Sequence, residues 1–285
     1  MAEAEAEESK MPLLEHLIEL RSRLMWSVIS IIVLFIAIFP FAEYVYQFLV
    51  HPLAIVFEKM GGHRRLIFTA LHEAFFTYIK LSLISAVFVA FPFISMQFWM
   101  FVAPGLYKHE KSALAPFLIA TPILFFMGGA MVYYIVMPWA YEFLLNFELQ
   151  GGDGTLPIVS EPKVNEYLSL AINLIFAFGI CFELPVVLSL LGRIGIISAK
   201  GMREKRKYAI LIAFIVAAVI TPPDVISQVL LASVLICLYE ISIFSVRLIE
   251  KKRVEQTDAD DADDDDEGDE ESDGETSETK AEPSS

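Results

Sequence analysis

Long apolar runs alternate with short polar segments along most of the chain. A transmembrane helix needs about 20 apolar residues to cross roughly 30 Å of hydrocarbon. Six stretches approach this length: residues 24–42, 75–98, 115–137, 167–191, 208–220 and 225–246. The pattern therefore predicts an all-α, polytopic membrane protein with six transmembrane helices.

The last two runs differ from the others. Run 208–220 corresponds to only about 20 Å of helix, and four residues, 221–224, separate it from the sixth run. We expect short fifth and sixth helices that form a shallow hairpin. Either a thinned bilayer or neighbouring protein must cover such a mismatch, so we also expect a concave face beside the hairpin.

Lys and Arg in the short loops predict the orientation of the chain. With the N-terminus in the cytoplasm, the segments on that side hold 15 Lys and Arg residues, and the opposite segments hold four: Lys59, Arg64, Arg65 and Lys163. We therefore expect both termini in the cytoplasm. The adjacent Arg64 and Arg65 oppose this orientation, but the basic residues before the fifth run outnumber them.

The chain divides into three parts: an acidic N-terminal extension (1–11), a membrane domain (12–253) and a tail (254–285). Residues 255–282 contain sixteen Asp or Glu against one Lys, so the tail carries the whole formal net charge of −15. Such a segment cannot bury apolar surface. We expect a disordered cytoplasmic tail, which either aids solubility or docks to a partner. The acidic start of the chain does not have the pattern of a cleavable signal peptide.

Two longer segments lie opposite the termini in this topology. Residues 44–60 are amphipathic and aromatic-rich, and Pro52 interrupts them, so we expect an irregular helical cap. Residues 138–166 contain Gly151, Gly152 and Gly154, which favour a loop.

Two acidic residues fall on the cytoplasmic side of this topology. Glu19 lies four residues before Arg23 on an amphipathic helix at the interface, and Glu110 follows Pro104 and Gly105 in the next cytoplasmic loop. Each has an ordinary explanation, an exposed ion pair for Glu19 and a polar loop for Glu110. Carboxylates there would also suit a ligand with guanidinium groups, because each can accept two parallel charge-assisted hydrogen bonds.

Glu183 lies inside the fourth run, where an ionisable side chain is costly and usually faces a cavity or a partner. Pro185 follows it and favours a kink. Asp224 and Gln228 lie at the tip of the predicted hairpin, where Asp224 could also cap the sixth helix.

The sequence offers little support for an enzyme. We find no arrangement of Ser, His and Asp, no zinc motif, no phosphate-binding loop and no cluster of metal ligands. Cys181 and Cys237 both lie in apolar runs, where cysteine packs as a small hydrophobic residue. No cofactor, metal or nucleic-acid partner is expected.

Four blocks, in the same order, resemble the TatC family: HLIELRSRL (16–24), FVAPGLYKHE (101–110), FELPVV (182–187) and TPPDVISQ (221–228). The resemblance covers roughly residues 12–253. It implies a receptor in the bacterial inner membrane for twin-arginine signal peptides of folded precursors. Such a receptor works with the single-span subunits TatA and TatB, forms homo-oligomers within the receptor complex, and uses the proton-motive force.

The resemblance also assigns roles to matching positions. It implies that the signal peptide is bound by Glu19, Glu110, Arg21 and Phe101. It implies intramembrane polar or partner contacts for Tyr133, Glu183, Asp224 and Gln228. It places Pro52 in the outer cap, and Pro185 is a further structural position. The long acidic tail does not match the family's usual short C-terminus.

Two other classes of function remain open. An ion-coupled transporter would use Glu183 and Asp224 as a proton relay, although the chain lacks the internal repeats and matched broken helices of such proteins. A passive scaffold would tolerate alanine at the acidic positions.

Overall fold

The computed structural model describes residues 2–59, 65–70, 72–106, 115–146, 161–221 and 225–270. Within these ranges all regular elements are helices. In chain order they are α1 (Ala2–Ile38), the 3₁₀ turn η1 (Phe39–Phe41), α2 (Ala42–Lys59), α3 (Glu73–Leu106), α4 (Ala115–Met131), the π-helical η3 (Val132–Val136), α5 (Met137–Leu145), α6 (Val164–Phe182), α7 (Leu184–Arg193), α8 (Ala199–Glu204), α9 (Arg206–Ile220) and α10 (Val225–Glu270).

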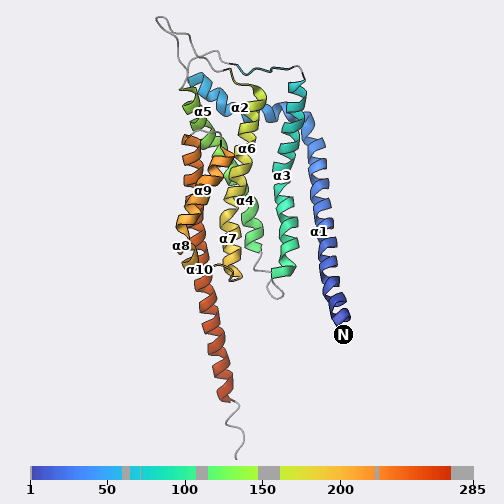
Figure 1. Cartoon of the computed structure of the whole chain (residues 1–285), viewed down its shortest axis with the longest axis vertical. Coiled ribbons are helices and arrows are strands. Elements are labelled where there is room, and N and C mark those ends of the chain that lie inside the picture. The colour runs from blue at the N-terminus through green and yellow to red at the C-terminus, as the bar shows by residue number, and fades with distance from the viewer. Residues whose placement is uncertain are drawn as a thin grey trace, which may run out of the picture.

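The long helices run side by side in an elongated bundle (Figure 1). The start of α1 and the end of α10 lie at one end, which we call the terminal end. Helix α2 crosses the opposite end, which we call the cap end, together with the starts of α3 and α6. The amphipathic segment is therefore a cap, as predicted, but its helix continues through Pro52 without interruption.

Five stretches of the described residues are long and apolar enough to cross a membrane: Glu15–Lys59, Glu73–Phe101, Pro116–Leu145, Val164–Arg193 and Ser227–Lys252. The predicted fifth run forms α9, a helix of 15 residues that is too short to be among them. The end of α9 and the start of α10 lie well short of α2 in Figure 1. The count of six spans remains a prediction.

The sixth helix is not short, contrary to expectation. It belongs to α10, a helix of 46 residues that continues to Glu270. The sixth run marks only the apolar part of this helix, and the polar residues that follow contain no proline to end it. The first part of the acidic tail thus continues the helix, and residues 271–285 lie outside the described ranges.

The fourth run is divided in two, as Pro185 predicts. Helix α6 ends at Phe182 and α7 begins at Leu184, with Glu183 between them. Because Pro185 has no N–H, the chain tightens before it, and the Glu183 N–H donates to the carbonyl oxygen of Ile180 at 3.0 Å.

Glycines allow α4 and α6 to approach closely. A Cβ atom at Gly128 would lie 2.7 Å from the carbonyl oxygen of Phe178, and one at Gly179 would lie 2.6 Å from the ring of Phe125. Small residues serve this purpose in membrane helices, where close packing replaces the hydrophobic effect. The main buried cluster includes Phe178 and is formed by residues of α2, α3, η3, α5, α6, α9 and α10.

An apolar cavity of about 510 Å³ lies beneath α2. Residues of α1, η1, α2, α3, α4, η3 and α6 line it, among them Ile38, Phe48, Phe88 and Tyr133. The expected concave face beside the α9–α10 hairpin remains a prediction.

Candidate functional site

Pro52 and Tyr133, 81 positions apart in the sequence, meet at the cap end. Proline has no N–H, so the carbonyl oxygen of Phe48, four residues earlier, loses its helical partner. The Tyr133 hydroxyl donates to this oxygen at 2.8 Å. The rings of Phe48 and Tyr133 also stack, with their centroids 4.4 Å apart. The Tyr133 hydroxyl therefore replaces the hydrogen bond that the proline removes from α2.

A second tyrosine supports the same stretch of α2. The buried Tyr167 hydroxyl of α6 donates to the carbonyl oxygen of Leu49 at 2.7 Å. Sequence reasoning did not select Tyr167, because an aromatic residue at the start of a span is typical of a membrane interface. Its partner is a backbone atom, which no motif reveals.

At the terminal end, α1 is joined to the end of α3 by Arg23. Its guanidinium lies 3.2 Å from a carboxylate oxygen of Glu19 and donates to Gln97 of α3 at 3.3 Å. The side chains of Glu19 and Arg23 are each about one-third exposed, 33% and 31%. The predicted ion pair is thus present, and the Glu19 carboxylate remains within reach of solvent.

Phe101 of α3 lies against the part of α1 that carries Glu19. The His16 ring, one helical turn before Glu19, stacks on the Phe101 ring with centroids 4.2 Å apart and planes inclined by 14°. Arg21 is exposed, and since it is two residues from Glu19 it points away from the Glu19 face of the helix. Glu110 lies outside the described residues.

Glu183 occupies a small polar cluster at the α6–α7 break. The indole N–H of Trp99 in α3 donates to the Thr121 hydroxyl of α4 at 2.9 Å, and Thr121 in turn hydrogen-bonds to the Glu183 carboxyl group. The Oε1 atom of Glu183 is buried and has no hydrogen-bond partner among the described residues. Sequence reasoning selected Glu183 but neither Trp99 nor Thr121, which are both neutral and lie within or next to apolar runs.

The α9–α10 turn is described only in part. Gln228 lies in the first turn of α10 and is half-buried, whereas Asp224 falls outside the described residues.

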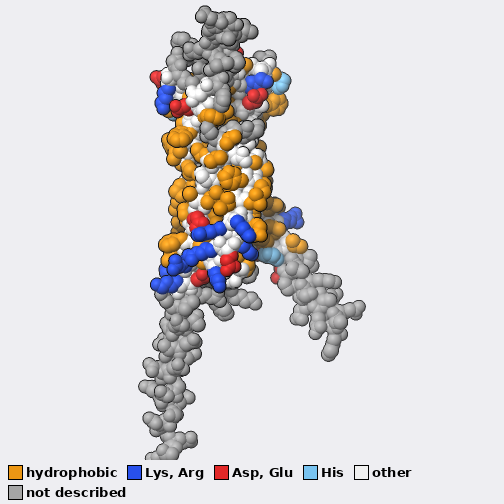
Figure 2. Space-filling view, turned by 60° about the vertical axis from the view of Figure 1, so that its left-hand side comes forward, with side chains coloured by type: hydrophobic (Ala, Val, Ile, Leu, Met, Phe, Trp, Pro, Cys, Tyr) orange, Lys and Arg blue, Asp and Glu red, His pale blue; other side chains and the backbone are white. Residues whose placement is uncertain are grey.

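Lys and Arg side chains gather at the terminal end of the bundle, below a broad apolar band (Figure 2). Two acidic residues of α10 bind groups of α8 and α9 in this region. Glu240 forms an ion pair with Arg206 at 2.5 Å, and Glu250 accepts a hydrogen bond from the backbone N–H of Ala199 at 2.9 Å. This distribution of charge is typical of the cytoplasmic boundary of a membrane protein.

The apolar band, the helical bundle and the charged boundary define a polytopic helical membrane protein, and the comparisons with known proteins identify its family. The sequence profile described as "Sec-independent protein translocase protein (TatC)" matches residues 15–233. The chain belongs to the TatC family.

Individual relatives agree with this assignment. The chain is 52% identical over 235 residues to the Sec-independent protein translocase protein TatC of Magnetococcus marinus, covering 82% of this chain and 83% of the relative. It is 40% identical over 234 residues to TatC of Escherichia coli, covering 82% and 87%. A crystal structure described as a twin arginine translocase receptor, TatC, superposes with a TM-score of 0.70 at 40% identity, covering 82% of this chain and 99% of the other.

Proposed function

We propose that this chain is the receptor for twin-arginine signal peptides in a translocase of the bacterial inner membrane. It binds the paired arginines of a folded precursor through Glu19 and Glu110, with Phe101 and Arg21 beside them. The observation that carries the proposal is the partly exposed Glu19 carboxylate on α1, one helical turn from His16, whose ring stacks on Phe101 of the distant helix α3.

The chemistry of this surface suits the ligand. A guanidinium stays charged at any physiological pH and presents a planar fork of donors to a carboxylate. Arg23 already occupies one oxygen of Glu19, so an arriving arginine would use the other oxygen or displace Arg23.

The apolar part of the signal would continue along α1 towards the cavity under the α2 cap. Glu19 and Ile38, which lines that cavity, are 19 residues apart, or about 28 Å along a helix. An apolar helix of similar length would reach from the carboxylate to the cavity.

The rest of the proposal concerns the assembly. The chain spans the membrane six times with both termini in the cytoplasm, consistent with the two helix ends at the basic end of the bundle. It works with TatA- and TatB-type subunits. In the membrane this chain makes polar or partner contacts through Gln228, Asp224, Tyr133 and Glu183. It forms homo-oligomers within the receptor complex, and the proton-motive force drives export.

Site-specific photo-crosslinking tests the receptor role. A photoreactive residue at Phe101 is exposed to a precursor with its paired arginines intact or changed to paired lysines. We expect a crosslink that requires the arginines and that disappears when Glu19→Ala and Glu110→Ala are combined. A probe at Phe68, which is 47% exposed at the cap end, should give no such crosslink. Equal crosslinking of both precursors would refute the proposal.

The buried, unpaired oxygen of Glu183 is the observation that favours an ion-coupled transporter. Such a protein would carry small solutes in proteoliposomes without any precursor, and Glu183→Gln would stop that flux. The receptor proposal expects no solute flux and a loss of precursor export when the gene is deleted.

A further inference from the structure

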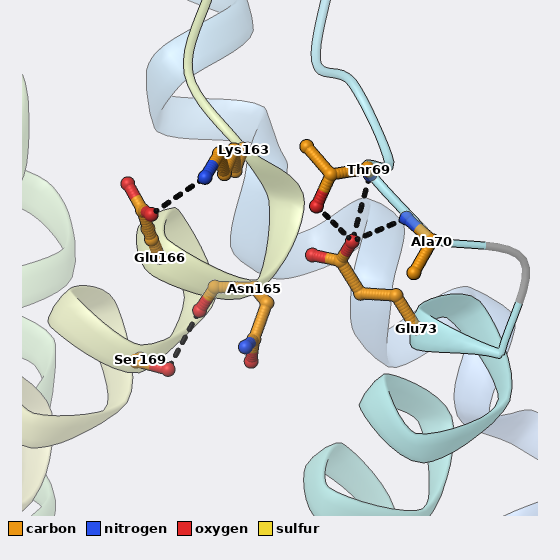
Figure 3. A network of polar contacts seen from close by, with 7 residues as sticks. All are labelled: Thr69, Ala70, Glu73, Lys163, Asn165, Glu166 and Ser169. Atoms are coloured by element: carbon orange, nitrogen blue, oxygen red, sulfur yellow. Dashed lines mark hydrogen bonds and ion pairs between the residues drawn. The ribbon is translucent and has the colours of Figure 1, made fainter.

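A pocket of about 760 Å³ opens at the cap end between the starts of α3 and α6. Its rim is polar and includes Glu73, Lys163 and Glu166, whereas Phe76 and Leu83 line it further along α3 towards the middle of the bundle. Figure 3 shows Glu73 at the start of α3 on one side, and Lys163 and Glu166 at the start of α6 on the other. A pocket with charged groups at its mouth and apolar side chains along its wall suits a bound amphiphile.

The Glu73 carboxylate is held by several hydrogen-bond donors, whereas the Glu166 carboxylate has one ion pair among the described residues. One oxygen of Glu73 accepts hydrogen bonds from the Thr69 N–H at 2.8 Å, the Thr69 hydroxyl at 3.0 Å and the Ala70 N–H at 3.3 Å. Glu166 lies 3.4 Å from Lys163 and is largely exposed. Both carboxylates line the pocket, Glu73 from the start of α3 and Glu166, with Lys163, from the start of α6 (Figure 3).

Lys80 lies deeper than this rim. It is seven residues after Glu73, or about 10 Å along α3, inside a stretch that can cross a membrane. Its ammonium donates to the Ser169 hydroxyl of α6 at 2.7 Å, and no carboxylate of the described residues pairs with it. Ser169 in turn donates to the carbonyl oxygen of Asn165 at 2.6 Å.

A lysine at this depth needs an anion or access to the interface, because a charged group in hydrocarbon costs several kcal/mol. A serine hydroxyl supplies a dipole but no charge. The exposed Lys80 side chain can extend towards the headgroup region, where the nearest anions in any bilayer are lipid phosphates.

We propose that this pocket binds one phospholipid from the leaflet on the cap side. The phosphate contacts Lys80, and a primary ammonium in the headgroup contacts Glu73 and Glu166. The acyl chains lie along Leu83, about one helical turn beyond Lys80. The ammonium of such a headgroup is only two carbon atoms from its phosphate, so the Lys80 side chain extends towards the rim to contact the phosphate while the rim carboxylates accept from the ammonium.

The lipid site does not depend on the receptor role. With the orientation proposed above, its lipid comes from the outer leaflet of the inner membrane. The site would join the starts of α3 and α6 through a lipid as well as through the Lys80–Ser169 contact.

Native mass spectrometry of the full-length protein in detergent tests the site. Dioleoyl phosphatidylethanolamine, phosphatidylcholine and phosphatidylglycerol are added separately at equal concentrations. We expect phosphatidylethanolamine to bind about tenfold more tightly than the other two, since only its headgroup can donate hydrogen bonds from a primary ammonium to the carboxylates.

Substitutions locate the binding. Lys80→Gln should lower the affinity for phosphatidylethanolamine about tenfold, whereas Lys59→Gln, an exposed lysine at the same end of the bundle, should leave it unchanged. Glu166→Gln should reduce the preference for phosphatidylethanolamine over phosphatidylcholine. Circular dichroism checks that each variant retains its helices.

Lys80→Arg keeps the cation and should bind within about threefold of the wild type. If Lys80→Gln does not fold, Lys80→Arg provides the test. A folded Lys80→Arg protein that has lost phosphatidylethanolamine binding would count against the phosphate contact. Equal binding of all three lipids, or unchanged binding by Lys80→Gln, would overturn the proposal.

Discussion

The cap end and the terminal end of the bundle are held together by different interactions. At the cap end, neutral hydroxyls of Tyr133 and Tyr167 bond to backbone oxygens of α2. At the terminal end, α1 meets α3 through the charged, partly exposed Arg23 and the stack of His16 on Phe101. The hydrogen bonds at the cap end hold α2 against η3 and α6 without any ligand. The contacts at the terminal end leave a carboxylate and an aromatic ring accessible, as a binding surface requires.

The largest effect is expected from reversing charge at the terminal end. Glu19→Arg should lower export of a twin-arginine reporter about 100-fold or more, because charged hydrogen bonds worth about 3 kcal/mol in total are lost and a repulsion is added. The Tm in detergent should hardly change, since a partly exposed ion pair contributes about 1 kcal/mol or less.

Export in living cells and Tm in detergent measure these two effects. Glu58→Arg, on an exposed residue of α2, is the matched control and should export normally. Normal export by Glu19→Arg would show that Glu19 does not bind the signal.

An intermediate effect is expected at the cap end. Tyr133→Phe should lower the free energy of unfolding by about 1–2 kcal/mol, because the partly buried Phe48 carbonyl loses its donor. In a Pro52→Ala background, alanine restores a backbone N–H that can bond to that carbonyl, so Tyr133→Phe should cost much less.

Denaturant unfolding of the four proteins in this double-mutant cycle gives a coupling energy, expected to be about 1 kcal/mol or more. Tyr134→Phe is the matched control, since Tyr134 is 71% exposed and its change should be near neutral. Additive effects of Pro52→Ala and Tyr133→Phe would contradict the repair of the helix by Tyr133.

The smallest effect is expected from salt. Raising the ionic strength from 0.1 M to 1 M shortens the screening length from about 10 Å to about 3 Å. Binding of a labelled twin-arginine peptide should weaken several-fold, whereas Tm changes due to Tyr133→Phe should be unaffected. A peptide with paired glutamines gives the baseline in fluorescence anisotropy. Binding that is independent of salt would argue against recognition by exposed charges.

The sequence predicted the helices better than their ends. Apolar runs located every long helix, and Pro185 located the break at Glu183. The length of α10 was missed because apolarity shows where a helix lies in the membrane, not where it stops. The cavity under α2 was not predicted, because it depends on how α2 folds over α1 and α3.

The candidate site was predictable in part. Glu19 and Phe101 were connected only through the resemblance, and the contact between their helices appears only in three dimensions. Lys80 was not selected because it lies within the apolar run 75–98, and the prediction of orientation used only the Lys and Arg residues of the loops. A single lysine in an apolar run is nevertheless a usable signal, of the same kind as Glu183.

The repair of α2 by Tyr133 has a consequence for how relatives of this chain diverge. The proline and the hydroxyl compensate for one another, so selection acts on the pair and not on either position alone. A lineage that lost the proline would be free to lose the hydroxyl, and one that kept the proline would be expected to keep a donor facing the same carbonyl. The two positions should therefore change together over evolutionary time.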